Sequence, residues 1–294
     1  MLDYKLLEAL ERVVAEGGFD KAARQLNITQ SAVSQRVKLL EDQTGMVLLT
    51  RTTPPVPTHE GQALLKHFIQ VRQLEGDLAA SLKLEGGSSF RTMALGINAD
   101  SLATWFYPAV SPFLKDRKVV LDLRVDDQDQ THKLLRNGEV LGCISSEQTP
   151  VQGCKVSHLG NMNYRMVATP EFKAQYFASG LTQEGLKAAP AVIYNQHDDL
   201  HARYIGKAIS SECMRDIPIH FVPSSEQFVV IILDSQAYGM VPDLQSMPYL
   251  ENGNLVELVP DTTWQVSLYW HRWNLDSTLL DDFSKAIVKN AVIC

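Results

Sequence analysis

Long hydrophobic runs are missing from this chain of 294 residues. Its longest unbroken apolar run covers residues 228–233, whereas a membrane-spanning helix needs roughly 20 apolar residues. The first residues also lack the basic segment, apolar stretch and small-residue cleavage site of a secretory signal. We therefore expect a cytoplasmic protein that has no membrane partner.

Cysteines are few, and the familiar motifs of catalysis and metal binding are absent. The four cysteines are irregularly spaced without a Cys-x-x-Cys pair, which argues against a disulfide framework, a zinc site and a redox motif. The chain has no Gly-x-Ser-x-Gly elbow, phosphate-binding loop, dinucleotide fingerprint or His-Glu-x-x-His motif. We predict that it is not an enzyme and that it needs neither a cofactor nor a metal.

An excess of basic charge is also missing. The formal net charge is −7, and residues 1–60 hold seven basic side chains against eight acidic ones. Proteins that coat nucleic acid by bulk electrostatics carry a broad excess of Lys and Arg. Any DNA binding must therefore come from a few placed residues. A chain of this length is also expected to divide into two or three domains.

The first sixty residues predict three short helices. Apolar residues recur at helical spacing over residues 6–14, between a capping Asp3 and a glycine pair that ends the helix. A second short helix covers residues 20–26. After a tight turn, Thr29 caps a third helix, over residues 30–43. A short helix, a tight turn and a capped helix are the geometry of a helix-turn-helix.

The outward face of the third helix has the chemistry needed to read a major groove. Amides pair with adenine, arginine (here Arg36) pairs with guanine, and hydroxyls contact bases or phosphate. A solvated polar face is the ordinary alternative, but the helix-turn-helix context favours a recognition helix. Residues 46–52 then predict a small β-wing that places Arg51 near phosphate. The candidate DNA-binding residues are Gln30, Ser31, Ser34, Gln35, Arg36, Lys38 and Arg51.

A long helix is predicted from Thr58 to about Glu85. Its apolar residues are spaced by three or four, which suits either a two-stranded seam or a helix packed on its own domain. Residues 86–89 are predicted to form a flexible hinge. The apolar stripe consists of Leu64, Phe68, Val71, Leu74, Leu78 and Leu82.

From residue 90 onward, apolar strands alternate with helical patterns, which predicts an α/β fold with mainly parallel sheets. In such sheets, ligands bind beyond the carboxyl ends of strands and close to helix N-termini. The predicted strands cover residues 92–97, 119–125, 140–144, 164–168, 191–194, 219–222, 238–241 and 266–270.

Acidic and small polar side chains follow the ends of these strands. Free helix-end amides there suit an α-carboxylate, and the carboxylates suit an α-amino group or a cationic side chain, so the pattern favours a basic amino acid. Helix capping is the alternative role for several of these residues, and the two roles are compatible. The candidate effector-binding residues are Asn98, Asp100, Ser101, Thr104, Asp126, Ser145, Asp198, Asp199, Ser225 and Glu226.

The first 61 residues resemble the LysR-type DNA-binding domain. The match consists of Phe19-x-x-Ala22-Ala23-x-x-Leu26-x-x-Thr29-Gln30-Ser31-Ala32-Val33-Ser34-Gln35-Arg36-Val37-x-x-Leu40-Glu41, then Gly45, Leu48, Arg51, Thr58 and Gly61. Leu49 departs from the family's usual Phe, which affects packing only. Residues 51–58, 96–105 and 269–272 further resemble the ArgP-type branch, which responds to lysine and arginine.

This resemblance covers nearly the whole chain and implies its organisation. Residues 1–58 are expected to form an N-terminal all-α winged helix-turn-helix, and residues 59–89 a linker or dimerisation helix with its hinge. Residues 90–294 are expected to form an α/β, two-lobed, periplasmic-binding-protein-like effector domain. One lobe takes about 90–162 and 268–294, the other takes about 163–267, and the effector lies in the cleft between them.

The resemblance implies a transcriptional regulator that binds specific sites on double-stranded DNA under the control of lysine or arginine. It also implies a homodimer or homotetramer, and it admits RNA polymerase as a further partner. An architectural or replication-linked DNA-binding protein without an effector is the alternative. Stabilisation by lysine or arginine during thermal unfolding separates the two readings, because only a ligand that binds the folded state stabilises it.

Overall fold

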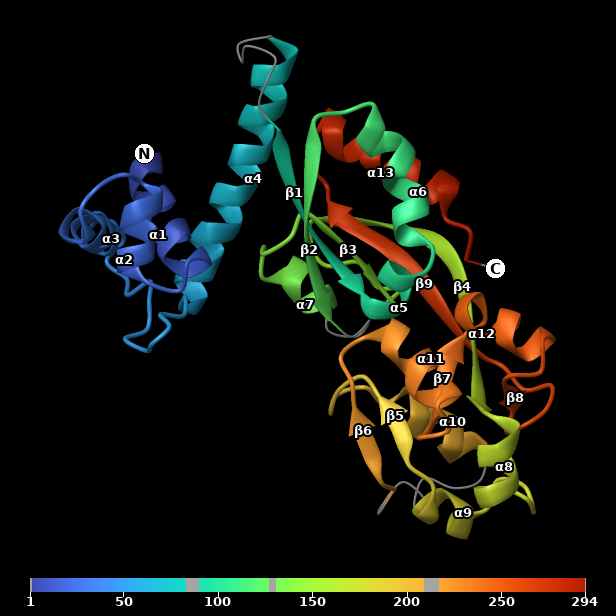
Figure 1. The fold of residues 1–294 in the computed structure, drawn as a ribbon. Helices are drawn as coiled ribbons and strands as arrows, with labels where there is room; N and C mark the ends of the chain where they lie inside the picture. Colours follow the sequence, from blue (N-terminus) through green and yellow to red (C-terminus); the bar gives the residue numbers. More distant parts are fainter. Residues whose placement is uncertain (1, 83–89, 127–130, 209–216, 294) are drawn as a thin grey trace.

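A computed structural model describes residues 2–82, 90–126, 131–208 and 217–293. These residues form a small N-terminal helical unit, one long helix beside it, and a larger α/β region in two lobes (Figure 1). Within the described residues, no helix combines the length and the apolar character needed to cross a membrane.

The N-terminal unit contains the three predicted helices, α1 (Tyr4–Ala15), α2 (Phe19–Gln25) and α3 (Gln30–Thr44). Both predicted N-caps are confirmed: Asp3 accepts a hydrogen bond from the Lys5 amide at 2.9 Å, and Thr29 accepts one from the Ala32 amide at 3.2 Å. The apolar faces of the helices meet in one small core. This core includes Leu7, Leu10, Ala22, Val33 and Leu40.

The predicted small β-wing over residues 46–52 is present with minimal strand pairing. The segment forms only an isolated antiparallel bridge between Leu49 and Pro57. The returning chain holds three prolines, which lack the amide hydrogen that a strand ladder requires. Instead, the Thr50 amide donates to the Val56 carbonyl at 2.8 Å, and the Thr50 side chain bonds the same residue.

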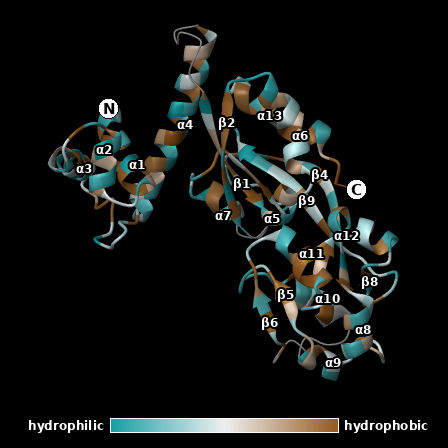
Figure 2. Cartoon of the chain, viewed as in Figure 1, coloured by the Kyte–Doolittle hydropathy of each residue, from teal (hydrophilic) through white to brown (hydrophobic). Residues whose placement is uncertain are grey.

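The long helix α4 covers His59–Ser81 and begins at Thr58, whose side chain accepts from the Gly61 amide at 3.1 Å. The remainder of the predicted helix beyond Leu82 and the predicted hinge at 86–89 lie outside the described residues. Hydrophobic and hydrophilic residues alternate along α4 (Figure 2). Phe68 is buried against the N-terminal unit, whereas Leu78 and Leu82 are each 57% exposed. The apolar stripe therefore packs on its own unit at one end and is open at the other.

Among the residues that the structure describes, nine strands form one continuous sheet in the order β2-β1-β3-β9-β4-β7-β5-β6, with β8 paired to β4. The strands are β1 (Arg91–Asn98), β2 (Val119–Asp126), β3 (Gly142–Ser145), β4 (Cys154–Ala168), β5 (Ala191–Ile193), β6 (Ile219–Phe221), β7 (Tyr238–Pro242), β8 (Val256–Glu257) and β9 (Trp264–Trp273).

The prediction of mainly parallel sheets is wrong for the middle of this sheet. Pairs β1–β2, β1–β3, β5–β6 and β5–β7 are parallel, but β4 and β9 pair antiparallel to each other and to β7 and β3. The predicted strands at 164–168 and 266–270 are segments of these longer strands. Polar residues in the first half of β4 hide the apolar alternation, because this half pairs with β9 at the lobe-1 part of the sheet and is only partly buried.

The remaining helices cover the two lobes that β4 and β9 connect (Figure 1). Lobe 1 contains β1–β3 with α5 (Ala99–Ala103), α6 (Phe106–Lys115), α7 (Thr131–Arg136) and α13 (Thr278–Asn290). Lobe 2 contains β5–β8 with α8 (Pro170–Tyr176), α9 (Gln183–Ala188), α10 (Leu200–Ala208), α11 (Ser225–Leu233) and α12 (Asp243–Glu251). The C-terminal helix returns to lobe 1, where the rings of Phe113 and Phe283 pack edge to face at 5.3 Å.

Candidate functional site

A small, partly open pocket lies between the two lobes. Lobe 1 contributes the ends of β1 and β2 and the start of α5. Lobe 2 contributes the segment after β5, helices α10 and α11, and strand β7. The lining residues are Asn98, Ala99, Asp100, Asp126, Tyr194, Asp198, Leu200, His201, Phe228 and Met240. This placement follows the rule that ligands bind beyond the carboxyl ends of parallel strands.

Asp100 presents a carboxylate that both lobes hold. Its Oδ2 accepts a hydrogen bond from the Tyr164 hydroxyl at 2.6 Å, and its Oδ1 accepts one from the Ser225 hydroxyl at 2.5 Å. Tyr164 belongs to the crossing strand β4 and Ser225 begins α11, so the second bond connects α5 of lobe 1 to lobe 2. The carboxylate thus joins the two walls of the cleft.

The surroundings of Asp100 raise the pKa of its carboxyl group. Asp100 as a residue keeps some exposed surface, but protein surrounds the carboxylate, and this desolvation raises its pKa. The hydroxyl groups of Ser225 and Tyr164 oppose that rise, whereas the negative charges of Asp198 and Glu226 add to it. A cation placed in the pocket would reverse the balance and stabilise the ionised form.

Several buried polar atoms around the pocket have no hydrogen-bond partner within the described residues. They are both amide atoms of Asn98, which is 2% exposed, the hydroxyl of Ser101 and Nε2 of His201. Burial lowers the pKa of His201 to about 4, so its ring is neutral near pH 7. Buried polar groups in native proteins are nearly always paired. Asn98 and His201 line the pocket, where a polar ligand can pair with their free atoms.

The structure brings together most of the predicted effector residues. Asn98, Asp100, Asp126 and Asp198 line the pocket, and Ser225 bonds Asp100 across it. Glu226 acts on Asp100 electrostatically, and Ser101 lies buried one residue after it. The Asp198 carboxylate also holds the turn before α10, because it accepts from the amides of Tyr194 at 3.2 Å and Leu200 at 3.1 Å.

Besides Ser101, Ser225 and Glu226, three further predicted effector residues lie outside the pocket lining. The Thr104 hydroxyl donates to the backbone carbonyl of Asp100 at 2.6 Å, and the Ser145 hydroxyl accepts from the Glu147 amide at 3.1 Å. Asp199 forms an exposed ion pair with Arg203 at 2.9 Å.

Sequence reasoning missed several residues of the site, including Ala99 and Leu200 of the pocket lining. Tyr164 lies inside a strand rather than at its end, and His201 belongs to the first turn of α10. The others are apolar or aromatic residues without a local signal of function: Tyr194, Phe228 and Met240. Among the described residues, no group of three or more His, Cys, Asp or Glu side chains is arranged to hold a metal ion.

A second functional surface lies on α3. Five of the seven predicted DNA-binding residues, Gln30, Ser31, Ser34, Gln35 and Lys38, are exposed and fall within about 140° of one another around the helix. Arg51 is also exposed, in the wing segment. The sixth α3 candidate, Arg36, is half-buried and is turned about 240° from Gln30, so it flanks the core face.

Both functional regions of the chain match known protein families. Residues 4–62 match the family of bacterial regulatory helix-turn-helix proteins of the lysR type, and residues 87–291 match the LysR substrate binding domain. The chain is 42% identical over 290 residues to the HTH-type transcriptional regulator ArgP of Photobacterium profundum, covering 99% of this chain and 97% of that protein. It is 41% identical over 298 residues to ArgP of Pseudomonas aeruginosa, covering 99% and 96%.

Solved structures agree with this relationship. The crystal structure of ArgP from Mycobacterium tuberculosis matches with a TM-score of 0.83 and 36% identity, covering 99% of this chain and 98% of that one. Full-length LysG from Corynebacterium glutamicum with bound effector Arg matches with a TM-score of 0.76 and 33% identity over the same shares. The helix-turn-helix, the two-lobed α/β region and these matches together show that the chain belongs to the LysR family of DNA-binding, effector-controlled transcriptional regulators.

Proposed function

We propose that the chain regulates transcription in response to a basic amino acid, lysine or arginine, bound between the two lobes. The observation that carries this proposal is the charge of the pocket. Its described lining holds three carboxylates, Asp100, Asp126 and Asp198, and neither lysine nor arginine. A ligand with an α-ammonium group and a cationic side chain has a net positive charge that complements such a lining.

The other lining residues suit the remainder of the same ligand. Leu200, Phe228 and Met240 offer apolar surface to the methylene groups of a long side chain. The unpartnered Asn98 amide can donate to an α-carboxylate. The bound arginine of the structurally similar LysG supports this choice of ligand class.

The DNA-binding half of the proposal uses the exposed face of α3 and the wing. We assign base contacts to the amides and hydroxyls of Gln30, Ser31, Ser34 and Gln35, and phosphate contacts to Lys38 and Arg51. A regulator that reads chromosomal DNA acts in the cytoplasm. Two copies joined along the open end of α4 would combine their affinities for a two-fold-related site. RNA polymerase is the partner that a transcriptional output requires.

Thermal unfolding with matched ligands tests the proposed effector. Arginine and lysine should raise the unfolding midpoint, because a ligand of the folded state stabilises it. Citrulline, a neutral and nearly isosteric analogue of arginine, should raise it much less. The difference between the midpoint shifts caused by arginine and by citrulline measures how much the acidic lining contributes to binding the side-chain cation.

Variants of the chain sharpen this test. Asp198→Asn should weaken the arginine response, while Asp199→Asn, next to it in sequence but paired with Arg203 outside the lining, should keep it. Equal stabilisation by arginine and citrulline would contradict the proposal that the acidic lining recognises the cationic side chain. A flat response to both lysine and arginine would show that the ligand class is wrong.

A further inference from the structure

One face of α4 contacts lobe 1 along most of the helix. The contacting residues are Gln62, Lys66, Ile69, Gln73 and Asp77, which fall within about 80° of one another around the helix. We call them the docking face. The open leucines of the apolar stripe, Leu74, Leu78 and Leu82, point to another side of the same helix. The docking face and the exposed stripe can therefore act independently.

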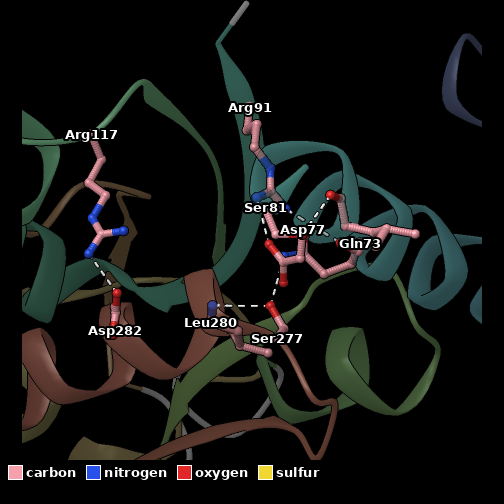
Figure 3. Close-up of polar contacts among 9 residues, drawn as sticks. Gln73, Asp77, Ser81, Arg91, Arg117, Ser277, Leu280 and Asp282 are labelled. Carbon is pink, nitrogen blue, oxygen red and sulfur yellow. Dashed lines mark hydrogen bonds and ion pairs between the residues drawn. The ribbon is translucent and has the colours of Figure 1, made fainter. Parts of the chain in front are cut away.

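The contacts of the docking face are specific rather than incidental. The Gln73 side chain is only 7% exposed, and its amide donates to the Ser277 hydroxyl at 3.0 Å. Ser277 is fully buried and caps α13 by accepting from the Leu280 amide at 3.2 Å (Figure 3). A buried amide that loses its partner costs free energy, so this bond favours one seating of the helix.

Charged and polar contacts continue above and below Gln73. The Asp77 carboxylate pairs with Arg91 at 2.6 Å, and both side chains are largely buried (Figure 3). Nearer the N-terminal unit, the Lys66 ammonium lies 4.1 Å from the ring centre of Trp273, and Gln62 donates to the Asn137 carbonyl. Four separate polar or cation–π contacts thus hold the helix to lobe 1.

Two of the residues contacted by α4, Arg91 and Trp273, occupy the ends of strands that lead toward the cleft. Arg91 is the first residue of β1, and Asn98, about 23 Å further along, is its last and lines the pocket. Trp273 ends β9, which pairs along its length with β4, the strand that holds Tyr164 against Asp100. A shift of the lobes around a ligand therefore moves the points on which α4 rests.

From this arrangement we propose that the docking face is a latch that couples the cleft to the DNA-binding unit. While docked, α4 holds the N-terminal unit in one orientation relative to lobe 1. Movement of β1 and β9 on effector binding changes the strength of docking and hence the DNA affinity. The identity of the effector in this proposal rests on the proposed function, whereas the docking itself does not.

A charge-swap cycle in the full-length chain tests the latch. Asp77→Arg and Arg91→Asp each place like charges together and should undock α4, and the double swap should restore the pair with its sign reversed. Asp77→Asn is the milder variant if either single swap folds poorly. Arg117→Asp is the matched control, because Arg117 forms an equally short ion pair of 2.6 Å with Asp282 on α13 without touching α4 (Figure 3).

Two readouts need no ligand. The single swaps should speed amide hydrogen exchange over residues 62–77 and change the DNA affinity of the ligand-free chain by about threefold or more, within the usual range of allosteric coupling. The double swap should return both to wild-type values, and Arg117→Asp should change neither. Single swaps that leave exchange and DNA affinity unchanged, or a control that changes them equally, would overturn the proposal.

The third readout is the change of DNA affinity that saturating arginine produces. The single swaps should reduce this change by about threefold or more, and the double swap should restore it. If wild type itself does not respond to lysine or arginine, the proposed effector is wrong. Altered ligand-free DNA affinity in the single swaps, restored in the double swap, would still support the latch.

Discussion

The surroundings of Asp100 raise the pKa of its carboxyl group. Desolvation raises its pKa, and two neighbouring acidic groups, Asp198 and Glu226, act in the same direction. A folded-state pKa above the value of the unfolded chain means that the folded state binds the proton more tightly. The stability from this group is therefore present at low pH and is lost as pH rises through the folded pKa. Binding sites often keep such groups because the ligand compensates them.

The pH dependence of unfolding checks this reading of Asp100. In Asp100→Asn, the free energy of unfolding should fall less than in wild type between about pH 4 and about pH 7.5, the range above the usual aspartate pKa. The same variant should lose most of its stabilisation by arginine. Urea unfolding at a series of pH values, with and without arginine, measures both effects. A wild-type pH slope in this variant would contradict the assigned pKa shift, and Asp199→Asn serves as the exposed control.

Residue-level reasoning from the sequence found the acids of the cleft but not their partners. Asp100, Asp126 and Asp198 each follow a predicted strand, and that local signal is visible in the sequence. Tyr164 and Ser225 are 64 and 125 residues from Asp100, and only folding brings their hydroxyls to its carboxylate. Arg36 differs from the other α3 candidates, because its position on the helix places it beside the core face and leaves it half-buried.

The wing segment and the start of α4 meet in one close backbone contact at Gly61. A Cβ atom on Gly61 would lie 2.1 Å from the backbone carbonyl oxygen of Leu48. Thr58 ties the same junction, since its amide donates to that oxygen at 2.9 Å and its hydroxyl donates to the Val47 carbonyl at 2.7 Å. The wing segment, although not a strand, is thereby held against the start of α4.

Gly61→Ala should therefore separate the wing from α4. We expect the free energy of unfolding to fall by about 1–3 kcal/mol, the usual cost of overpacking, together with weaker DNA binding. Denaturant unfolding and DNA-binding assays measure the two effects. Gly18→Ala is the control, because a Cβ at Gly18 meets no atom within 4 Å. Equal free energies of unfolding in the two variants would show that the backbone around Gly61 shifts to accept a Cβ atom without loss of stability.

The sequence predicts well where the capped helices begin. It predicts less well the strands whose extent depends on pairing with a distant strand. The N-caps Asp3, Thr29 and Thr58 mark helix starts because each side chain bonds an amide two or three residues away. The long strands β4 and β9 were predicted only in part. Their pairing depends on residues about 100 positions apart, such as Asn161 and Ser267, which bond at 2.8 Å.

In the assembled chain, α4 presents its remaining apolar surface to solvent. Leu78 and Leu82 are more than half exposed, and Leu74 is exposed beside them. An exposed stripe with this spacing suits a second copy of the same helix. The proposed homodimer or homotetramer would cover it.

Leu78→Glu should weaken self-association, because it places a charge in the centre of that stripe. DNA affinity should fall by about 100-fold or more, since the two sites would no longer bind as one unit. Sedimentation measures the first effect and DNA titration the second. Ala80→Glu adds the same charge at an exposed position about 160° away around the helix, on the side of the docking face, and should leave self-association unchanged. A Leu78→Glu chain that associates and binds DNA like wild type would contradict this assignment of the stripe.

The sequence by itself determined the class of the protein. Helix periodicity, caps and the polar face of α3 depend on residues within a few positions of one another, so they are legible along the chain. The same holds for the acidic residues that follow the strands.

Only the tertiary structure decided how these pieces work together. It made the middle of the sheet antiparallel, placed Tyr164 and Ser225 on the Asp100 carboxylate, and seated Gln73 on Ser277. Each of these outcomes depends on which distant surfaces bury one another, and a local pattern does not specify that choice.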